Sequence, residues 1–66
     1  MERGMLLGMK PQIVRYRVCE QDGAFLAQCV DVDVASEGDT EEEAVANLSE
    51  ALEHYFDAPV TLILAP

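Results

Sequence analysis

The stretch Gly38-Asp39-Thr40-Glu41-Glu42-Glu43-Ala44 predicts a turn followed by the start of a helix. Thr40 is a good N-cap, because its hydroxyl can accept a hydrogen bond from a first-turn N–H. Glu43 lies three residues further on and completes a capping box. The three glutamates place negative charge at the positive end of the helix dipole, and Gly38 allows a sharp turn before the cap. We therefore expect strands before this point and one helix after it.

The helix is predicted over residues 41–56, where apolar residues recur at helical spacing and form one stripe. Asp57-Ala58-Pro59 should end it, because the residue before a proline avoids the α region. The stripe consists of Ala44, Val45, Leu48, Ala51, Leu52, Tyr55 and Phe56.

Residues 60–65 are almost wholly apolar and predict a final strand. An uncovered apolar strand at a sheet edge promotes aggregation, so this strand is either internal or paired with another chain. We favour self-association, and an internal fourth strand remains the alternative. The expected oligomer interface is formed by Val60, Leu62, Ile63 and Leu64.

A β-hairpin is predicted before the helix. Residues 12–20 alternate between polar and apolar, as in a half-buried strand. Asp22-Gly23 is typical of a two-residue type I′ turn, and residues 24–30 return as the second strand. This turn places Val18 opposite Ala27, and opposed residues share a face. The predicted core face consists of Val14, Tyr16, Val18, Phe25, Ala27 and Cys29, and the predicted open face of Ile13, Arg15, Arg17, Cys19, Leu26, Gln28 and Val30.

Candidate chemical groups are few. Cys19 and Cys29 fall on opposite faces of the hairpin, which excludes a disulfide between them. Two cysteines with one distant histidine do not form a zinc pattern. His54 is the sole histidine and has no nucleophile beside it in the sequence. We therefore predict no catalytic residue, no metal, no cofactor and no enzymatic activity.

A third, short strand is predicted over residues 32–37, after a bend. Asp31 and Asp33 share one side of this segment. A calcium site would need more oxygen ligands and a loop glycine, so we interpret the two aspartates as edge charges that discourage edge-to-edge pairing. The predicted fold class is α+β in the order β-β-β-α-β, with an antiparallel three-stranded sheet, one helix on one face and a C-terminal fourth strand.

Charge narrows the classes of partner. The 66 residues carry a net charge of −9, with 13 acidic and four basic side chains. Direct binding to nucleic acid is not expected, because phosphate contacts need a basic surface. A basic protein is the natural complement, and a merely solvated acidic surface is the alternative. The basic residues, Arg3, Lys10, Arg15 and Arg17, all lie in the first part of the chain.

Length and hydropathy give further expectations. A domain this short is marginal as a monomer, so we expect a homo-oligomer, either a dimer or a tetramer. No apolar run approaches the roughly 18 residues of a membrane span, and residues 1–8 lack the apolar core of a signal peptide. We expect a cytoplasmic protein with a flexible N-terminal extension over residues 1–11 and a single domain over residues 12–66.

The element order and one extended motif resemble the HicB-like family, whose members are the antitoxins of HicA–HicB toxin–antitoxin pairs. The motif is Gly38-Asp39-Thr40-x-Glu42-Glu43-Ala44-x-x-Asn47-x-x-Glu50-Ala51-Leu52. The hairpin agrees through Asp22-Gly23, Phe25, Ala27 and Asp31, so that the resemblance covers about residues 13–56. Residues 30–34, Val-Asp-Val-Asp-Val, stand where the family usually has a Pro-Asp-Leu-Pro-Gly-like turn.

The resemblance implies a truncated ribonuclease-H-like sheet and a non-catalytic, protein-binding function. By this likeness the chain would bind and occlude a small basic RNA-cleaving toxin of the HicA type. We expect the toxin to meet Asp31, Asp33, Glu37 and Glu42. The sequence ends one strand after the helix, so we expect a short form without the DNA-binding segment of full antitoxins. The alternative is a solitary HicB-like homo-oligomer with another partner or a structural role.

Overall fold

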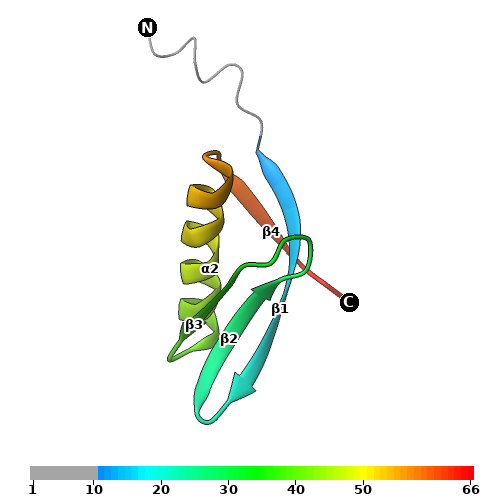
Figure 1. Ribbon diagram of the computed structural model, residues 1–66. Helices are drawn as coiled ribbons and strands as arrows, with labels where there is room; N and C mark the ends of the chain where they lie inside the picture. The colour runs from blue at the N-terminus through cyan, green and yellow to red at the C-terminus, as the bar shows by residue number, and fades with distance from the viewer. Residues whose placement is uncertain (1–10) are drawn as a thin grey trace, which may run out of the picture.

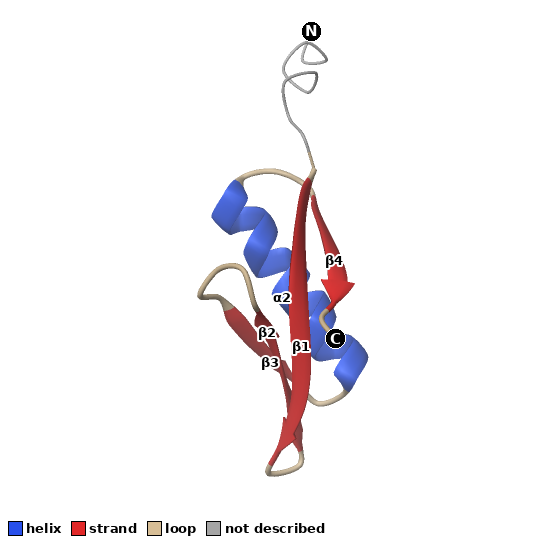
Figure 2. Cartoon of the chain, turned by 90° about the vertical axis from the view of Figure 1, so that its right-hand side faces the viewer, coloured by secondary structure: helices blue, strands red, loops and turns tan. Residues whose placement is uncertain are grey.

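The computed structural model describes residues 11–66, which form one mixed four-stranded sheet and one helix (Figure 1). The elements are β1 (Gln12–Gln21), β2 (Ala24–Cys29), β3 (Ala35–Gly38), α2 (Glu41–Phe56) and β4 (Val60–Leu64). Strand order is β3-β2-β1-β4, and α2 crosses one face of the sheet diagonally (Figure 2). The chain is therefore α+β, as predicted. The predicted extension over residues 1–11 lies outside the described residues except for Pro11.

The β1–β2 hairpin has the predicted register, with Tyr16 opposite Cys29 and Val18 opposite Ala27. Asp22 (φ 52°) and Gly23 (φ 83°) both lie in the left-handed region, as a type I′ turn requires. Because the register is fixed, Cys29 is buried and Cys19 is exposed on the other face, and both are free thiols. On the open face of the hairpin, the side chains of Ile13, Arg15 and Arg17 are exposed to solvent.

The third strand begins later than predicted. β3 starts at Ala35, and residues 30–34 form a loop closed by a 2.9 Å hydrogen bond from Cys29 N–H to the Val34 carbonyl. Within it, Val32 and Val34 pack against the core while Asp31 and Asp33 face solvent. The loop thus reproduces the alternating burial of a strand without its pairing. The interpretation of the two aspartates as strand-edge charges is wrong, because neither lies in a strand.

The hydrophobic core is small. Ala44, Leu48 and Leu52 of α2 recur every four residues and lie fully buried on the sheet. The spacing predicts Tyr55 in this stripe, but its side chain is 61% exposed, and its ring packs edge-on against Phe56 at a centroid distance of 5.0 Å. Phe56, which is also predicted in this stripe, packs against the core. The whole set of buried side chains is Val14, Ala27, Cys29, Ala44, Leu48 and Leu52.

The junction between β3 and α2 is closely packed. A Cβ on Gly38 would overlap the Ala44 backbone nitrogen and lie 2.9 Å from the Ala44 Cα. Its φ is not in the left-handed region, so Gly38 is needed for close approach and not, as predicted, for a sharp turn. Thr40 is the N-cap, and its Oγ1 accepts a 3.0 Å hydrogen bond from Glu43 N–H. The Glu43 carboxylate accepts in turn from Asp39 N–H at 2.8 Å.

β4 lies parallel to β1, with Val14 opposite Leu62. Two hydrogen bonds of 2.8 Å frame the pair, from Gln12 N–H to the Pro59 carbonyl and from Ala65 N–H to the Tyr16 carbonyl. β4 is an edge strand of the sheet. The pairing leaves its Ile63 and Leu64 side chains 49% and 61% exposed.

Gly38→Ala is expected to lower the free energy of unfolding by about 1–3 kcal/mol, because the new methyl group must displace helix backbone. Urea denaturation of both proteins measures the difference. Gly23→Asn is the control: open space surrounds Gly23, and asparagine tolerates the left-handed conformation. It should cost under about 1 kcal/mol. Equal stability of Gly38→Ala and the wild type would contradict the packing argument.

Candidate binding surface

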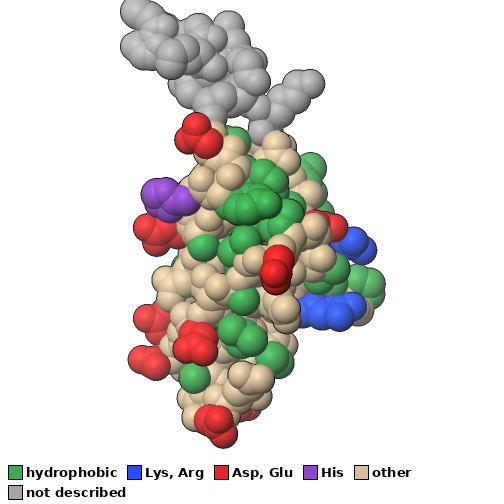
Figure 3. All heavy atoms as spheres, viewed as in Figure 1, with side chains coloured by type: hydrophobic (Ala, Val, Ile, Leu, Met, Phe, Trp, Pro, Cys, Tyr) green, Lys and Arg blue, Asp and Glu red, His purple; other side chains and the backbone are tan. Residues whose placement is uncertain are grey.

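The acidic side chains lie on the outside, and most of them lie away from the basic ones. Every Asp and Glu of residues 11–66 is exposed. Figure 3 shows acidic side chains along the side formed by α2 and basic ones on the opposite side, over β1. In the described part of the chain, Asp31 is the one acid that forms an ion pair with another described residue. The remaining carboxylates leave an acidic surface that complements a basic macromolecule.

The four predicted interface residues are exposed but do not share one element. Asp31 and Asp33 lie in the loop of residues 30–34. Glu37 stands on β3 opposite Leu26 and so faces the open side of the sheet. Glu42 belongs to the first turn of α2, in the helix layer on the other side. A partner that touched all four would have to wrap around the β3 side of the domain.

Asp31 is already engaged with Arg15. Its carboxylate accepts hydrogen bonds from Arg15 N–H at 2.7 Å and from Arg15 Nη2 at 2.9 Å. Val30 N–H donates to the Arg15 carbonyl at 2.8 Å, just beyond the last ladder pair of β1 and β2. The Asp31 carboxylate therefore accepts the hydrogen bond from Arg15 N–H that a carbonyl of the neighbouring strand would accept if the ladder continued. Both side chains remain partly exposed, so this bond matters more for the geometry of the loop than for stability.

The ion pair shifts the titration of both groups. The hydrogen bond from the Arg15 side chain, and then that from its backbone N–H, hold the pKa of Asp31 below its ordinary value of 3.8. The same carboxylate raises the pKa of Arg15. Sequence reasoning missed this pair, although extending the hairpin register by one residue puts Val30 opposite Arg15 and Asp31 next to it.

A hollow of about 410 Å³ lies beside the first turns of α2. Its lining combines Tyr16 of β1 with Val45 and the carboxylate residues Glu41 and Glu42. Tyr16 and Val45 are half-buried, whereas the two glutamates are exposed. The combination of apolar wall and acidic rim suits the aliphatic stem and charged head of a lysine or arginine side chain. No local sequence signal joins Tyr16 to these glutamates, because their proximity depends on how α2 crosses the sheet.

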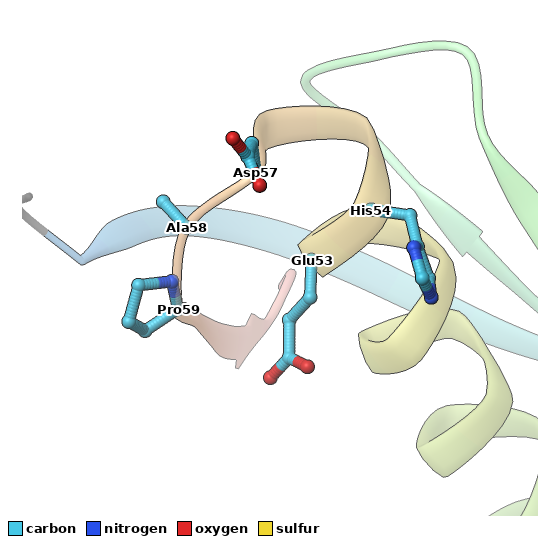
Figure 4. A pocket seen from close by; sticks show the side chains of 5 residues that line it. All are labelled: Glu53, His54, Asp57, Ala58 and Pro59. Carbon is cyan, nitrogen blue, oxygen red and sulfur yellow. The ribbon is translucent and has the colours of Figure 1, made fainter.

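The other end of α2 carries a hollow of about 430 Å³ lined by Glu53, His54, Asp57, Ala58 and Pro59. Figure 4 shows the Glu53 and His54 side chains pointing in different directions from the helix. Asp57 is the C-cap in the left-handed conformation, with its N–H bonded to the Glu53 carbonyl. These residues end the helix and do not converge on one point. Among residues 11–66, no three His, Cys, Asp or Glu side chains are grouped to hold a metal ion.

No family model matches the chain, and neither a curated protein nor a solved structure matches it. No helix among residues 11–66 is both long and apolar enough to cross a membrane.

Asp31 is expected to titrate below pH 3.8 in the folded protein, which NMR of its carboxyl carbon measures. Because its folded pKa is depressed, its contribution to stability is present above the unfolded pKa and is lost as pH falls through the folded pKa. Arg15→Gln should move the midpoint upward, and only in part, because the backbone N–H of residue 15 still donates.

Arg17→Gln is the matched control, since Arg17 lies on the same face of β1 and makes no bond to Asp31. It should leave the Asp31 midpoint unchanged. An equal shift in both variants, or a wild-type midpoint at the ordinary value, would contradict the role of the ion pair.

Proposed function

We propose that this chain is a non-catalytic protein-binding module of the HicB-like type. In this proposal it binds a small basic RNA-cleaving protein of the HicA type and covers the surface on which that protein holds RNA. The observation that carries the proposal is the acidic surface over α2 and β3, where no carboxylate forms an ion pair with another residue of the described range 11–66. The resemblance of the capped-helix motif to HicB-like antitoxins supports the same conclusion.

The electrostatic argument favours a protein partner over nucleic acid. With a net charge of −9, the chain repels phosphates and attracts cationic surfaces. A ribonuclease must present basic groups to its RNA, so an acidic protein can compete for the same groups. Opposite charge of this kind raises the association rate and fixes the orientation of the partners. Such a partner acts on cellular RNA, which is why we also propose a cytoplasmic location.

The hollow beside Tyr16 supplies an anchor for one basic side chain of the partner. Interfaces concentrate binding energy in a few pockets that hold arginine or aromatic groups. Glu42, one of the predicted interface residues, lines this hollow together with Glu41. The proposed interface therefore runs from this hollow around α2 to Glu37 and Asp33, while Asp31 stays bound to Arg15.

A truncated ribonuclease-H-like relation is part of the proposal. It is supported by the β4–β1 parallel pair beside an antiparallel hairpin and by one helix on one face. True ribonuclease H enzymes use a convergent group of acids on metal ions. The described acids form no such group, so we propose that the likeness is one of fold and that nuclease activity is absent.

The second candidate is a solitary HicB-like homo-oligomer with another partner. It is favoured by a specific observation, the exposed apolar side chains of Ile63 and Leu64 on the edge strand β4. The two functions are compatible, because β4 and the acidic surface occupy different parts of the molecule.

The partner proposal predicts that the tagged chain, expressed in its source cell, retains a small basic protein at low salt. Adding the chain should inhibit RNA cleavage by that protein. Its affinity should fall about tenfold or more between low and high salt, because salt screens exposed charges. Failure to inhibit cleavage, or a salt-independent affinity, would contradict the proposal.

A charge-matched pair of variants locates the interface. Combining Asp33→Asn, Glu37→Gln and Glu42→Gln should weaken binding about tenfold or more by removing charge at the proposed surface. Combining Glu20→Gln, Glu53→Gln and Asp57→Asn removes the same charge outside the proposed interface, on β1 and at the C-terminal end of α2, and should weaken it far less. Equal losses would mean that only net charge matters, and that these residues form no specific interface.

A further inference from the structure

The two edges of the sheet are unequal, because α2 closes one of them. On β3, the Asn47 side-chain amide donates a 2.9 Å hydrogen bond to the Glu37 carbonyl. This carbonyl is thereby removed from pairing with another strand. β3 is also only four residues long and carries the charge of Glu37, and both features discourage edge pairing. The first turn of α2 packs directly against Gly38 at the end of this strand.

Within residues 11–66, the β4 edge has none of these protections. In a parallel ladder, alternate residues direct their N–H and C=O groups to the same side. The Pro59 carbonyl and the Ala65 N–H form hydrogen bonds with β1. The alternate residues between them, Thr61 and Ile63, therefore also direct their backbone N–H and C=O groups to β1. The backbone groups of Val60, Leu62 and Leu64 are therefore directed to the free side. The strand Val-Thr-Leu-Ile-Leu contains no charge and no proline.

We propose that this edge pairs with β4 of a second copy of the chain. The two strands run antiparallel about a twofold axis at Leu62, so that Leu62 faces its own counterpart and Val60 faces Leu64 of the other copy. The two four-stranded sheets then join into one sheet of eight strands with both helices on the same face. Such a pairing is self-complementary, as a twofold interface requires.

Charge favours the β4 edge over the other surfaces for contact between two copies of the chain. Two chains of net charge −9 repel each other wherever their acidic surfaces meet. β4 is uncharged, and its neighbour β1 carries Arg15 and Arg17, the two basic residues of the described part of the chain. The β4 edge is therefore the side on which two copies approach with least repulsion. A basic partner is attracted instead to the acidic surface on α2 and β3.

The small core gives a second reason for association. Leu48 and Leu52 are the largest fully buried side chains of the described residues, and Ala27 and Ala44 contribute little apolar area. A domain of this size is marginal alone and gains stability from a partner subunit. This proposal does not depend on the identity of the basic partner, because it concerns a different surface.

Sedimentation velocity from about 1 μM to about 200 μM tests the proposal. The wild type should form a species of twice its 7.3 kDa mass. Leu64→Lys should raise the dimer Kd about tenfold or more, because lysine opposes edge pairing. Ile13→Lys is the matched control: Ile13 is 66% exposed and Leu64 61%, but Ile13 lies on an inner strand. A wild-type monomer throughout, or equal effects of the two variants, would overturn the proposal.

A backbone change keeps the test independent of side-chain effects on folding. A synthetic chain methylated on the Leu62 backbone nitrogen loses one outward donor and keeps every side chain. It should remain folded by circular dichroism and sediment as a monomer; a dimer as tight as wild type would overturn the proposal.

Salt separates this association from partner binding, because screening should strengthen the pairing of like-charged copies and weaken the complex with a basic protein.

Discussion

The close contact between Gly38 and the first turn of α2 is the constraint on which the rest of the structure depends. Because Gly38 has no side chain, the backbone at Ala44 can lie directly against the end of β3. The Thr40 cap then starts the helix at that point, and Ala44, Leu48 and Leu52 fall in succession onto the sheet. The same placement brings Asn47 over the Glu37 carbonyl and closes the β3 edge. The lack of a side chain at Gly38 thus determines how α2 packs on the sheet, and it also determines that the β3 edge is closed while the β4 edge stays accessible.

Sequence reasoning succeeded where a local signal decides the structure. Asp22-Gly23 selects the turn and, with it, the register of β1 and β2, because a two-residue loop leaves no freedom in pairing. The Thr40 cap and the apolar stripe likewise specify the bounds of α2. The start of β3 was predicted too early, because Val32 and Val34 alternate with aspartates as in a half-buried strand. The loop of residues 30–34 shows the same alternating burial, so this pattern does not distinguish it from a strand.

Features that depend on tertiary geometry could not be predicted in this way. The hollow between Tyr16 and Glu42 exists only because α2 crosses the sheet at a particular angle. Tyr55 has helical spacing suited to the core, yet Phe56 occupies the last core position. The hairpin register places Asp31 near Arg15, but it does not determine that the chain leaves the sheet there and directs the Asp31 carboxylate to the Arg15 N–H.

The charge pattern and the edge asymmetry divide the surface between two kinds of interaction. The acidic side over α2 suits a basic protein, and the uncharged β4 edge suits another copy of the chain. Since these surfaces are separate, a dimer would present two acidic surfaces at once, which raises its avidity for a partner with two binding sites. The two proposed interactions should respond to salt in opposite directions, because one would join unlike charges and the other like charges.

Amide hydrogen exchange along β4, followed by NMR at low and high protein concentration, tests the central claim most directly. If one edge is closed by α2 and the other is open for pairing, Thr61 and Ile63 N–H should exchange slowly at both concentrations. Leu62 N–H should become slow only at the high concentration, as the edge becomes paired. Rapid exchange of Leu62 at both concentrations, or slow exchange at both, would contradict the account.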